Sequence, residues 1–265
     1  MFVDTHCYFD FPPFIHDIED SFSRAVKAGV TDIIVPAVGI ENFARVYSLA
    51  QQYPHLYAAL GFHPLYIADF LPDHFAKLVA LLQQNSNKCV AIGEIGLDYF
   101  VTNAVVKQQQ ALLIQQLQLA KQYDLPVILH SRKSHDQLAA LLRRFDLPKK
   151  GVIHGFAGSL LSQANAFIRL GYFIGIGGVI TYQRVKKTRA VAAQLPLSSL
   201  VLETDAPDMP LAGFQGQVNR PERIGLVFEA LCNLRQESAE EIATQLYNNS
   251  LQLFNIKKEQ TNMTK

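Results

Sequence analysis

Histidines and acidic residues that could bind a divalent cation recur at the ends of short apolar segments in this chain. They are Asp4 and His6, His63, Glu94, His130, His154 and Asp205. Imidazole mixed with carboxylate suits zinc, manganese and nickel, and exchangeable magnesium. The other four of the eight histidines, His16, His55, His74 and His135, fall in predicted loops or helices, where a solvated surface position is expected. The pattern predicts one divalent-metal site built from distant parts of the chain.

Carboxylates and imidazoles gathered in one place would be costly without a cation, because isolated charges are unfavourable at low dielectric. One or two divalent ions would remove that cost and activate a water molecule for attack on an ester. With two ions, Glu94 could bridge them, so that the attacking and leaving oxygens are both held. Asp205 could bind an ion and accept a proton from the water. We therefore predict Glu94 and Asp205 as catalytic residues of a metal-dependent hydrolase.

The segments that carry these residues are predicted to be β-strands. Most are near-continuous apolar runs rich in Val and Ile, as expected for strands covered on both faces. Longer stretches of helical period lie between them. In residues 104–123, Leu113, Leu117 and Ala120 share one face, with Gln and Lys on the remaining faces. The predicted strands are 2–6, 32–38, 56–62, 89–95, 126–131, 151–155, 172–177 and 200–205.

Eight repeated βα units in 265 residues favour an α/β fold, a (β/α)8 TIM barrel, over an open doubly wound sheet. Barrel enzymes build their active sites at the carboxyl ends of the strands, so the candidate ligands would meet at one mouth. We expect residues 1–255 to form a single amidohydrolase-like barrel domain. The polar tail 256–265 is expected to be unstructured.

The composition limits where the protein works and what it contacts. With 24 basic and 23 acidic residues the net charge is +1, so any contact with nucleic acid must be local. Cys7, Cys89 and Cys232 form no CxxC pair and no even disulfide set, which suits a reducing compartment. No secretion signal and no spanning apolar run is recognisable. We expect a cytoplasmic protein that is a monomer and does not enter membranes.

Several segments carry a resemblance to a known family, in order and in spacing, over nearly the whole chain. They are DTHCYFDFPPF (4–14), GFHP (61–64), GEIGLDY (93–99), LPVILHSR (125–132), HGFAGS (154–159), GIGG (175–178), LETDAP (202–207) and NRP (219–221). Together they resemble the TatD-type metal-dependent deoxyribonucleases. The match is especially close to the uncharacterised YjjV-like branch, through DFPPF and through DMPLAGFQGQ at 208–217.

The resemblance implies a barrel hydrolase with one or two divalent ions that cleaves phosphodiester bonds of DNA with an activated water. It implies one ion held by His6, Glu94 and Asp205, and another held by Glu94, His130 and His154. We expect the substrate to be nucleic acid that is single-stranded or offers an end.

The end of the first strand departs from the family pattern, which is His-x-His. This chain has His6-Cys7-Tyr8. A phenol with an ordinary pKa near 10 is a much poorer ligand at neutral pH than imidazole. Strand alternation turns the sulfur of Cys7 away from the other ligands. The sequence therefore predicts that the first ion binds more weakly here than in relatives with both histidines.

Phosphodiester substrates also need cationic or amide donors. Ser131 and Arg132 follow His130 directly, and the loop after the seventh strand carries the basic residues Arg184, Lys186, Lys187 and Arg189, where barrel enzymes often bind phosphate. A solvated helix face is the competing interpretation for that cluster. The resemblance suggests that His63 contacts substrate or positions the water. Asn219 could contact substrate or cap a helix, and Asp98 is expected to orient a neighbouring ligand.

Three functions fit these residues. The first is a metal-dependent deoxyribonuclease or other phosphodiesterase. The second is a hydrolase of amides or esters, including cyclic amides and aminoacyl esters, because the same activated water attacks carbonyl carbon. The third is a binding or regulatory module in which Tyr8 marks a lost activity. The presence of Glu94, His130, His154 and Asp205 argues against the third.

Overall fold

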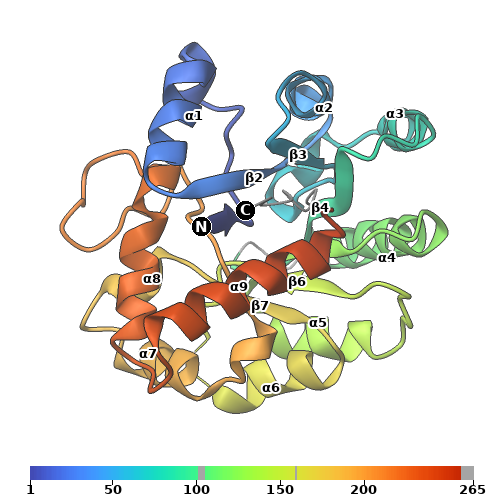
Figure 1. Cartoon of the computed structure of the whole chain (residues 1–265). Coiled ribbons are helices and arrows are strands. Elements are labelled where there is room, and N and C mark those ends of the chain that lie inside the picture. The colour runs from blue at the N-terminus through green and yellow to red at the C-terminus, as the bar shows by residue number, and fades with distance from the viewer. Residues whose placement is uncertain (101–104, 159, 258–265) are drawn as a thin grey trace.

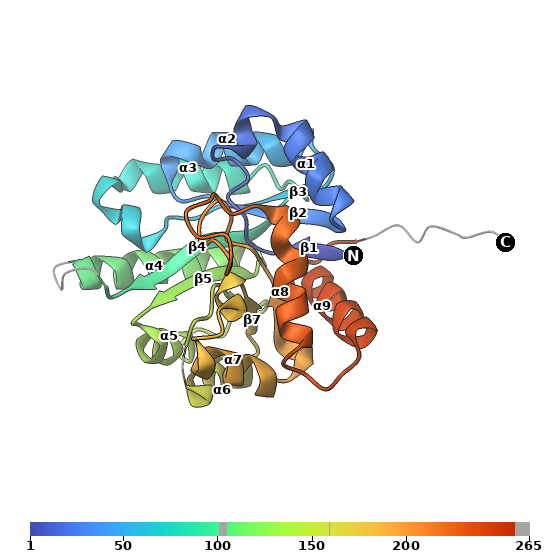
Figure 2. The ribbon, with the colours of Figure 1, turned by 90° about the vertical axis from the view of Figure 1, so that its left-hand side faces the viewer.

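A computed structural model describes residues 1–100, 105–158 and 160–257. Eight parallel strands pair in the order of the sequence, β1 to β8, and helices surround them (Figures 1 and 2). The strands are β1 Phe2–Asp4, β2 Val30–Pro36, β3 Leu56–Ala59, β4 Cys89–Asp98, β5 Val127–Arg132, β6 Gly151–Ile153, β7 Phe173–Ile176 and β8 Leu200–Leu202. Each lies within or overlaps a predicted strand, and the predicted TIM barrel is confirmed.

Hydrogen bonds across the β1 and β8 ends bring the first and last strands together. The backbone N–H and the hydroxyl of Thr5 both donate to the Leu202 carbonyl oxygen, at 3.0 and 2.8 Å. The Asp4 carboxylate accepts from the backbone N–H of Thr204 at 3.0 Å and from its hydroxyl at 2.6 Å. Residues about 200 positions apart therefore become neighbours, directly beneath the mouth where His6 and Asp205 lie.

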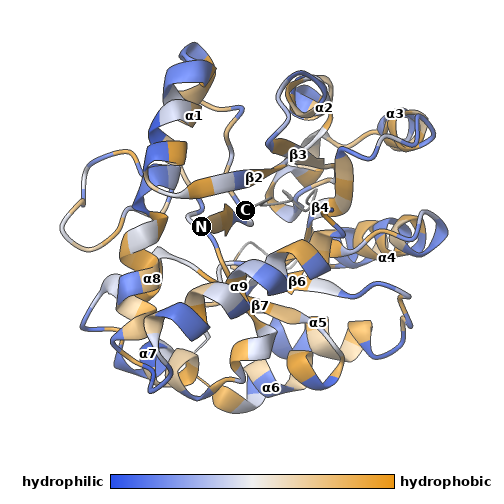
Figure 3. Ribbon diagram, in the orientation of Figure 1, coloured by the Kyte–Doolittle hydropathy of each residue, from blue (hydrophilic) through white to orange (hydrophobic). Residues whose placement is uncertain are grey.

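Amphipathic helices cover the outside of the barrel. They are α1 Ile18–Lys27, α2 Ile40–Gln52, α3 Pro72–Leu82, α4 Val106–Gln122, α5 His135–Leu142, α6 Leu161–Arg169, α7 Lys186–Gln194, α8 Ile224–Cys232 and α9 Ala239–Phe254. Hydrophobic and hydrophilic residues alternate along them (Figure 3), because one side packs on the strands and the other meets water. Among the described residues, none of these helices is long and apolar enough to cross a bilayer.

Helix α9 lies across the face of the barrel shown in Figure 1, at the end opposite the predicted site. Its last residues, Leu253 and Phe254, pack in a buried cluster with barrel residues such as Val3 and Ile34. Ile256, which we assigned to the polar tail, is only 7% exposed and belongs to the same cluster. The packed part of the chain therefore extends at least to this residue, and positions 258–265 lie outside the described residues.

Helix α4 differs in one respect from the prediction for 104–123, of which residue 104 is not described. Leu113, Leu117 and Ala120 are buried as expected, but Gln109 and Gln116 are buried as well. The Gln116 amide accepts from the Phe62 N–H at 2.7 Å and donates to the Phe62 carbonyl at 3.3 Å. Beyond the end of a strand the backbone loses its ladder partners, and a glutamine amide supplies both a donor and an acceptor.

We expect Gln116→Ala to lower the free energy of unfolding by about 2 kcal/mol, because it leaves a buried N–H and a buried carbonyl of Phe62 without partners. Urea denaturation followed by circular dichroism measures the change. Gln115→Ala, on the exposed side of the same helix, is the matched control and should change stability by less than about 0.5 kcal/mol. Equal effects of the two substitutions would contradict the structural role of Gln116.

Candidate metal centre

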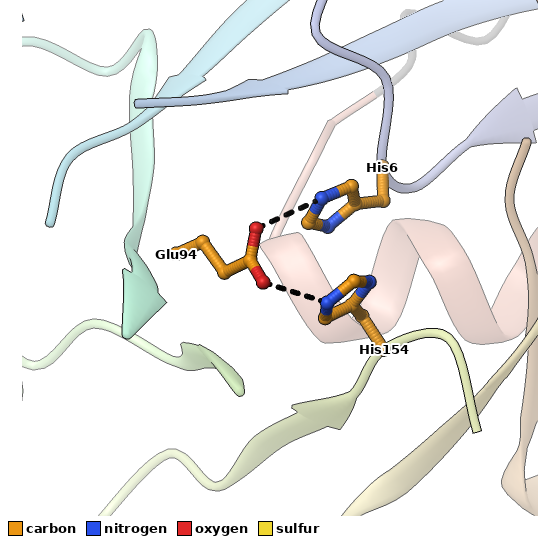
Figure 4. A group of neighbouring side chains, drawn as sticks. All are labelled: His6, Glu94 and His154. Carbon is orange, nitrogen blue, oxygen red and sulfur yellow. Dashed lines mark ion pairs between the residues drawn. The ribbon is translucent and has the colours of Figure 1, made fainter. Parts of the chain in front are cut away.

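The carboxylate of Glu94, in the middle of β4 and fully buried, is the point on which the histidines converge. Oxygen-to-nitrogen distances from Glu94 are 3.2 Å to His6 Nε2, 3.1 Å to His63 Nε2, 3.0 Å to His130 Nδ1 and 2.7 Å to His154 Nε2. His6 and His154 approach opposite oxygens of the carboxylate (Figure 4). Side chains that lie in or just after five different strands of the barrel thus meet at one place.

Two overlapping groups of side chains offer atoms close enough to hold ions. One is His6, Glu94 and His154, and the other is His63, Glu94 and His130; within each group the candidate ligand atoms lie within 4.8 Å of one another. In the part of the chain that the structure describes, both ring nitrogens of His6 are buried and form no hydrogen bond of good geometry, although Nε2 faces carboxylate oxygens of Glu94 and Asp205 at 3.2 and 3.6 Å. Buried polar atoms without hydrogen bonds are costly, and a divalent ion between these side chains would satisfy the lone pair of Nε2. The site therefore fits a metal.

The pairing of histidines in the structure differs from the arrangement that the resemblance implies. His154 was expected to share an ion with His130, but its ring stacks on that of His6, with the centroids 3.9 Å apart and the planes 10° apart. Asp205 lies on the side of His6, with Oδ1 3.6 Å from His6 Nε2. Glu94 belongs to both groups, which suits a bridging position.

His63 is placed to position other groups. Its Nδ1 accepts a hydrogen bond from the Leu65 N–H at 3.1 Å, so a neutral His63 ring carries its proton on Nε2. That nitrogen lies 3.1 Å from Glu94 Oε1. A protonated nitrogen has no lone pair for an ion, so in this arrangement His63 orients the Glu94 carboxylate.

His130 is held in the opposite way. Its Nε2 lies 2.9 Å from Asp98 Oδ2, while Nδ1 faces Glu94. The Asp98 carboxylate fixes the proton on Nε2 and leaves the Nδ1 lone pair free for a metal ion, as carboxylates behind metal-binding histidines commonly do. The Gln109 amide in turn holds the backbone of Asp98: its oxygen accepts from the Asp98 N–H at 2.8 Å, and its NH2 donates to the Asp98 carbonyl at 3.1 Å. The orienting role expected for Asp98 agrees with these contacts.

We expect Asp98→Asn to weaken metal binding by about 10- to 100-fold. The new amide can turn its NH2 toward His130 Nε2, which moves the ring proton to Nδ1 and blocks the ligand position. Calorimetric titration of the metal-free protein with Zn²⁺ or Mn²⁺ measures the affinity. Asp146→Asn removes a carboxylate that is 96% exposed and should leave it unchanged. Unaltered affinity in Asp98→Asn would show that His130 does not bind an ion through Nδ1.

Two further buried carboxylates support the site: Glu203, which the sequence analysis did not single out, and Asp4, which it counted among the candidate ligands. Glu203 accepts from the Gly155 N–H, and its Oε1 lies 3.7 Å from His154 Nδ1. A side chain at Gly175 would collide with Glu203, so glycine there makes room for this carboxylate. Asp4 accepts from the backbone N–H of His6 at 3.3 Å. Residues 203 and 205 stand two positions apart, as do 4 and 6, and that spacing was the available signal.

Burial and the neighbouring imidazole rings act in opposite directions on the pKa values of the carboxyl groups at the centre. Burial raises the pKa of the Glu94 carboxyl, but His154, His63 and His6 outweigh burial and hold that pKa well below its usual range. Asp205 has fewer neighbouring histidines than Glu94, and burial raises its pKa to about 8. Glu94 is therefore the permanently ionised carboxylate of the centre. In the metal-free protein, Asp205 and also Asp4, whose pKa burial raises to about 7, are able to exchange a proton near neutral pH.

Tyr8, at the position of the second family histidine, points into the same centre. Its hydroxyl donates to Glu94 Oε2, and its ring stands edge-on to His6 with the centroids 5.1 Å apart. Burial, together with the charge of Glu94, raises the pKa of the phenol well above its ordinary value. The neutral hydroxyl therefore occupies the oxygen of Glu94 that also faces His6. Cys7 is buried in the main hydrophobic cluster, as strand alternation predicted.

A cavity of about 750 Å³ opens over the centre. Its walls include aromatic and apolar side chains, among them Phe11, Phe156 and Val179, and Leu65, Tyr66 and Met209 at its rim are about half exposed. Ser131 and Arg132, which the sequence analysis proposed as substrate contacts, both line the cavity. Among the described lining residues, Arg132 is the single Lys or Arg.

Three residues predicted to contact substrate lie elsewhere. Arg184 and Lys186 are exposed and are not among the described residues that line the cavity. Asn219 is fully buried, and its amide donates to the carbonyls of Thr204 and Met209 at 2.8 and 3.2 Å. Its amide is thus used to hold the loop that follows Asp205. Of the histidines expected at the surface, His16 and His55 are exposed, whereas His135 is half-buried against Phe156.

Comparison with known proteins identifies the family to which this arrangement belongs. The family model described as TatD related DNase matches residues 3–255. The chain belongs to the TatD related DNase family. It is 58% identical over 255 residues to the uncharacterized metal-dependent hydrolase YjjV of Escherichia coli (strain K12), covering 96% of this chain and 98% of YjjV. It is 44% identical to an uncharacterized metal-dependent hydrolase of Haemophilus influenzae, covering 96% and 99% of the two chains.

Solved structures of TatD relatives have the same fold. The crystal structure of YjjV from Escherichia coli superposes with a TM-score of 0.94 and covers 97% of this chain and 98% of YjjV. A TatD family hydrolase of Entamoeba histolytica, 24% identical, superposes with a TM-score of 0.83 and covers 96% and 97% of the two chains. This member of the TatD family is a metal-dependent hydrolase of the YjjV-like branch.

Proposed function

We propose that the protein is a metal-dependent phosphodiesterase that cleaves DNA, with single strands or strand ends as its substrate. The observation that carries the proposal is the position of Arg132 on the cavity wall, two residues after His130 on β5. Residues two apart on a strand face the same way, roughly 7 Å apart. A phosphate held beside the centre is thus within reach of a guanidinium, the side chain best shaped for phosphate oxygens.

The aromatic and apolar walls of the cavity favour nucleic acid as the substrate over a small charged molecule. Tyr66 and Phe11 offer ring surfaces, and Leu65 and Met209 offer apolar surface at the rim. Unpaired bases stack on such surfaces without regard to sequence. A double helix buries its bases, so the cavity favours single strands and frayed ends.

A bound divalent ion would polarise the phosphate and activate the attacking water. His6, Glu94 and His154 would hold it at one side, and Glu94 with His130 at the other. Asp205 is the proton acceptor in this scheme, because its Oδ1 lies 3.6 Å from His6 Nε2 and the charge of a bound ion would keep its carboxylate ionised. Arg132 would neutralise the phosphate, and His63 would keep Glu94 oriented.

Cleavage of a fluorescent single-stranded oligonucleotide by metal-free protein, reloaded with Mg²⁺, Mn²⁺, Zn²⁺ or Ni²⁺, tests the proposal. Esters, lactones and cyclic amides are assayed in parallel, because Arg132 is the single cation on the described cavity wall and neutral carbonyl substrates are the competing class. Arg132→Ala should reduce oligonucleotide cleavage strongly and leave any carbonyl hydrolysis nearly unchanged. Carbonyl hydrolysis without cleavage of nucleic acid would replace the proposal with the ester or amide hydrolase.

A further inference from the structure

An exposed aromatic residue with two cations stands just outside the cavity. Phe100, two residues beyond the end of β4, is 59% exposed. The guanidinium carbon of Arg132 lies 3.9 Å from the centre of its ring, and Lys133 Nζ lies 4.6 Å from it. We refer to Phe100, Arg132 and Lys133 as the rim platform.

The two cations of the rim platform have no carboxylate within ion-pair distance among the residues that the structure describes. In the regions that the structure describes, the guanidinium of Arg132 and the ammonium of Lys133 form no ion pair with a carboxylate. Other basic side chains do form one, such as Arg45 with Asp10 and Arg235 with Glu237. The backbone at Lys133 also has φ of 54°, an unfavourable region for a residue with a side chain. Two cations that form no ion pair with a described carboxylate, beside an exposed ring, attract an anion that also carries a flat apolar surface.

The rim platform is connected to the metal centre through a chain of contacts. The Phe100 N–H donates to Asp98 Oδ1 at 2.9 Å, and the other oxygen of that carboxylate contacts His130. Arg132 belongs to both the cavity wall and the rim platform. A strand of nucleic acid whose phosphate sits at the centre would therefore meet Phe100 as it leaves the cavity.

We propose that the rim platform binds the nucleotide next to the one being cleaved, with its base packed on the exposed surface of Phe100 and its phosphate paired with Lys133 and Arg132. The proposal rests on the phosphodiesterase function above and gives it a second nucleotide subsite. Its ligand class is an extended single strand of DNA at least a few nucleotides long. A mononucleotide ester or small aryl phosphodiester is too short to reach it.

The test compares a ten-nucleotide single strand with bis(p-nitrophenyl) phosphate as substrates of the metal-loaded protein. Phe100→Leu keeps an apolar side chain but removes the aromatic face, and should raise KM for the oligonucleotide about tenfold, since stacking of one base contributes about 1–3 kcal/mol. Its kcat, and both constants for the aryl ester, should stay within twofold. Phe100→Trp should retain the wild-type KM. Lys133→Ala should raise the oligonucleotide KM and flatten its dependence on salt.

Lys77→Ala is the matched control for charge, because Lys77 is 60% exposed on α3 and should leave both KM values unchanged. An unchanged oligonucleotide KM in Phe100→Leu, in a protein that cleaves the oligonucleotide, overturns the rim platform alone. Cleavage of the aryl ester with no measurable binding of the oligonucleotide overturns it as well. Absence of cleavage of every phosphodiester would instead remove the proposed function, and the rim platform with it.

Discussion

Glu94→Ala is expected to abolish hydrolysis, with a loss of at least about 1000-fold, and to remove bound metal in the same step. Glu94 is the one side chain shared by both groups of potential ligands, and four imidazoles face its two oxygens. Without the carboxylate those rings face one another with no negative charge between them. Metal analysis of the purified variant by mass spectrometry and an assay with the substrate that the wild type cleaves measure the two losses.

Thermal unfolding separates loss of the ion from loss of the fold. An ion present at about 100 times its dissociation constant stabilises the folded protein by about 2.7 kcal/mol, so a chelator should lower the Tm of the wild type. The Tm of Glu94→Ala should not respond to the chelator, while its circular dichroism remains that of a folded barrel. Glu240→Ala, at an exposed position at the start of α9, should behave as the wild type. A variant at position 94 that keeps full metal content would refute this centre.

Tyr8→His is expected to raise the metal content from one ion toward two ions per chain. The Tyr8 hydroxyl donates to Glu94 Oε2, the oxygen that also faces His6. A neutral phenol at that place occupies a lone pair of Glu94 Oε2 that the first ion would need. The phenol oxygen is itself only a weak ligand. An imidazole offers a nitrogen ligand instead. We therefore expect the wild type to hold one ion firmly and the variant to bind a second, with a separate step in a Zn²⁺ titration.

Tyr8→Phe is the matched control for Tyr8→His. It removes the hydroxyl and keeps the ring, so it frees Glu94 Oε2 without supplying a ligand, and its metal content should stay at one ion. Hydrolysis should increase about tenfold or more in Tyr8→His, because a second ion would help to hold the leaving oxygen. Two ions bound equally firmly in the wild type would show that the phenol does not weaken the first position.

The candidate ligands and the place where they meet could be predicted from local sequence patterns. His130 and His154 each follow an apolar run that became β5 or β6, and Glu94 lies inside the run that became β4. Parallel strands of a barrel have their carboxyl ends at the same mouth, so the topology was enough to bring these side chains together. The motif GEIGLDY also placed Asp98 four residues after Glu94, where it supports His130.

Spacing along the chain did not reveal which polar side chains are buried. Gln109 and Gln116 fit the solvent-facing side of an amphipathic helix by sequence, yet Gln109 binds the backbone of the last residue of β4 and Gln116 binds the backbone just beyond β3. Asn219 read as a possible substrate contact, yet its amide holds the loop after Asp205. In each case the partner is a backbone group of another segment, and helical or strand periodicity carries no information about it.

The sequence by itself determined the family, the alternation of strands and helices, and the side chains able to hold a divalent ion, because each of these depends on residue type and on order along one chain. Only the tertiary structure decided that His6 stacks on His154, that His63 carries its proton toward Glu94, and that Tyr8 donates to the same carboxylate. It also separated Arg132 on the cavity wall from Arg184 and Lys186 outside it. The reason is physical: hydrogen-bond direction, ring stacking and access to a cavity depend on distances between strands, which no spacing within a single segment encodes.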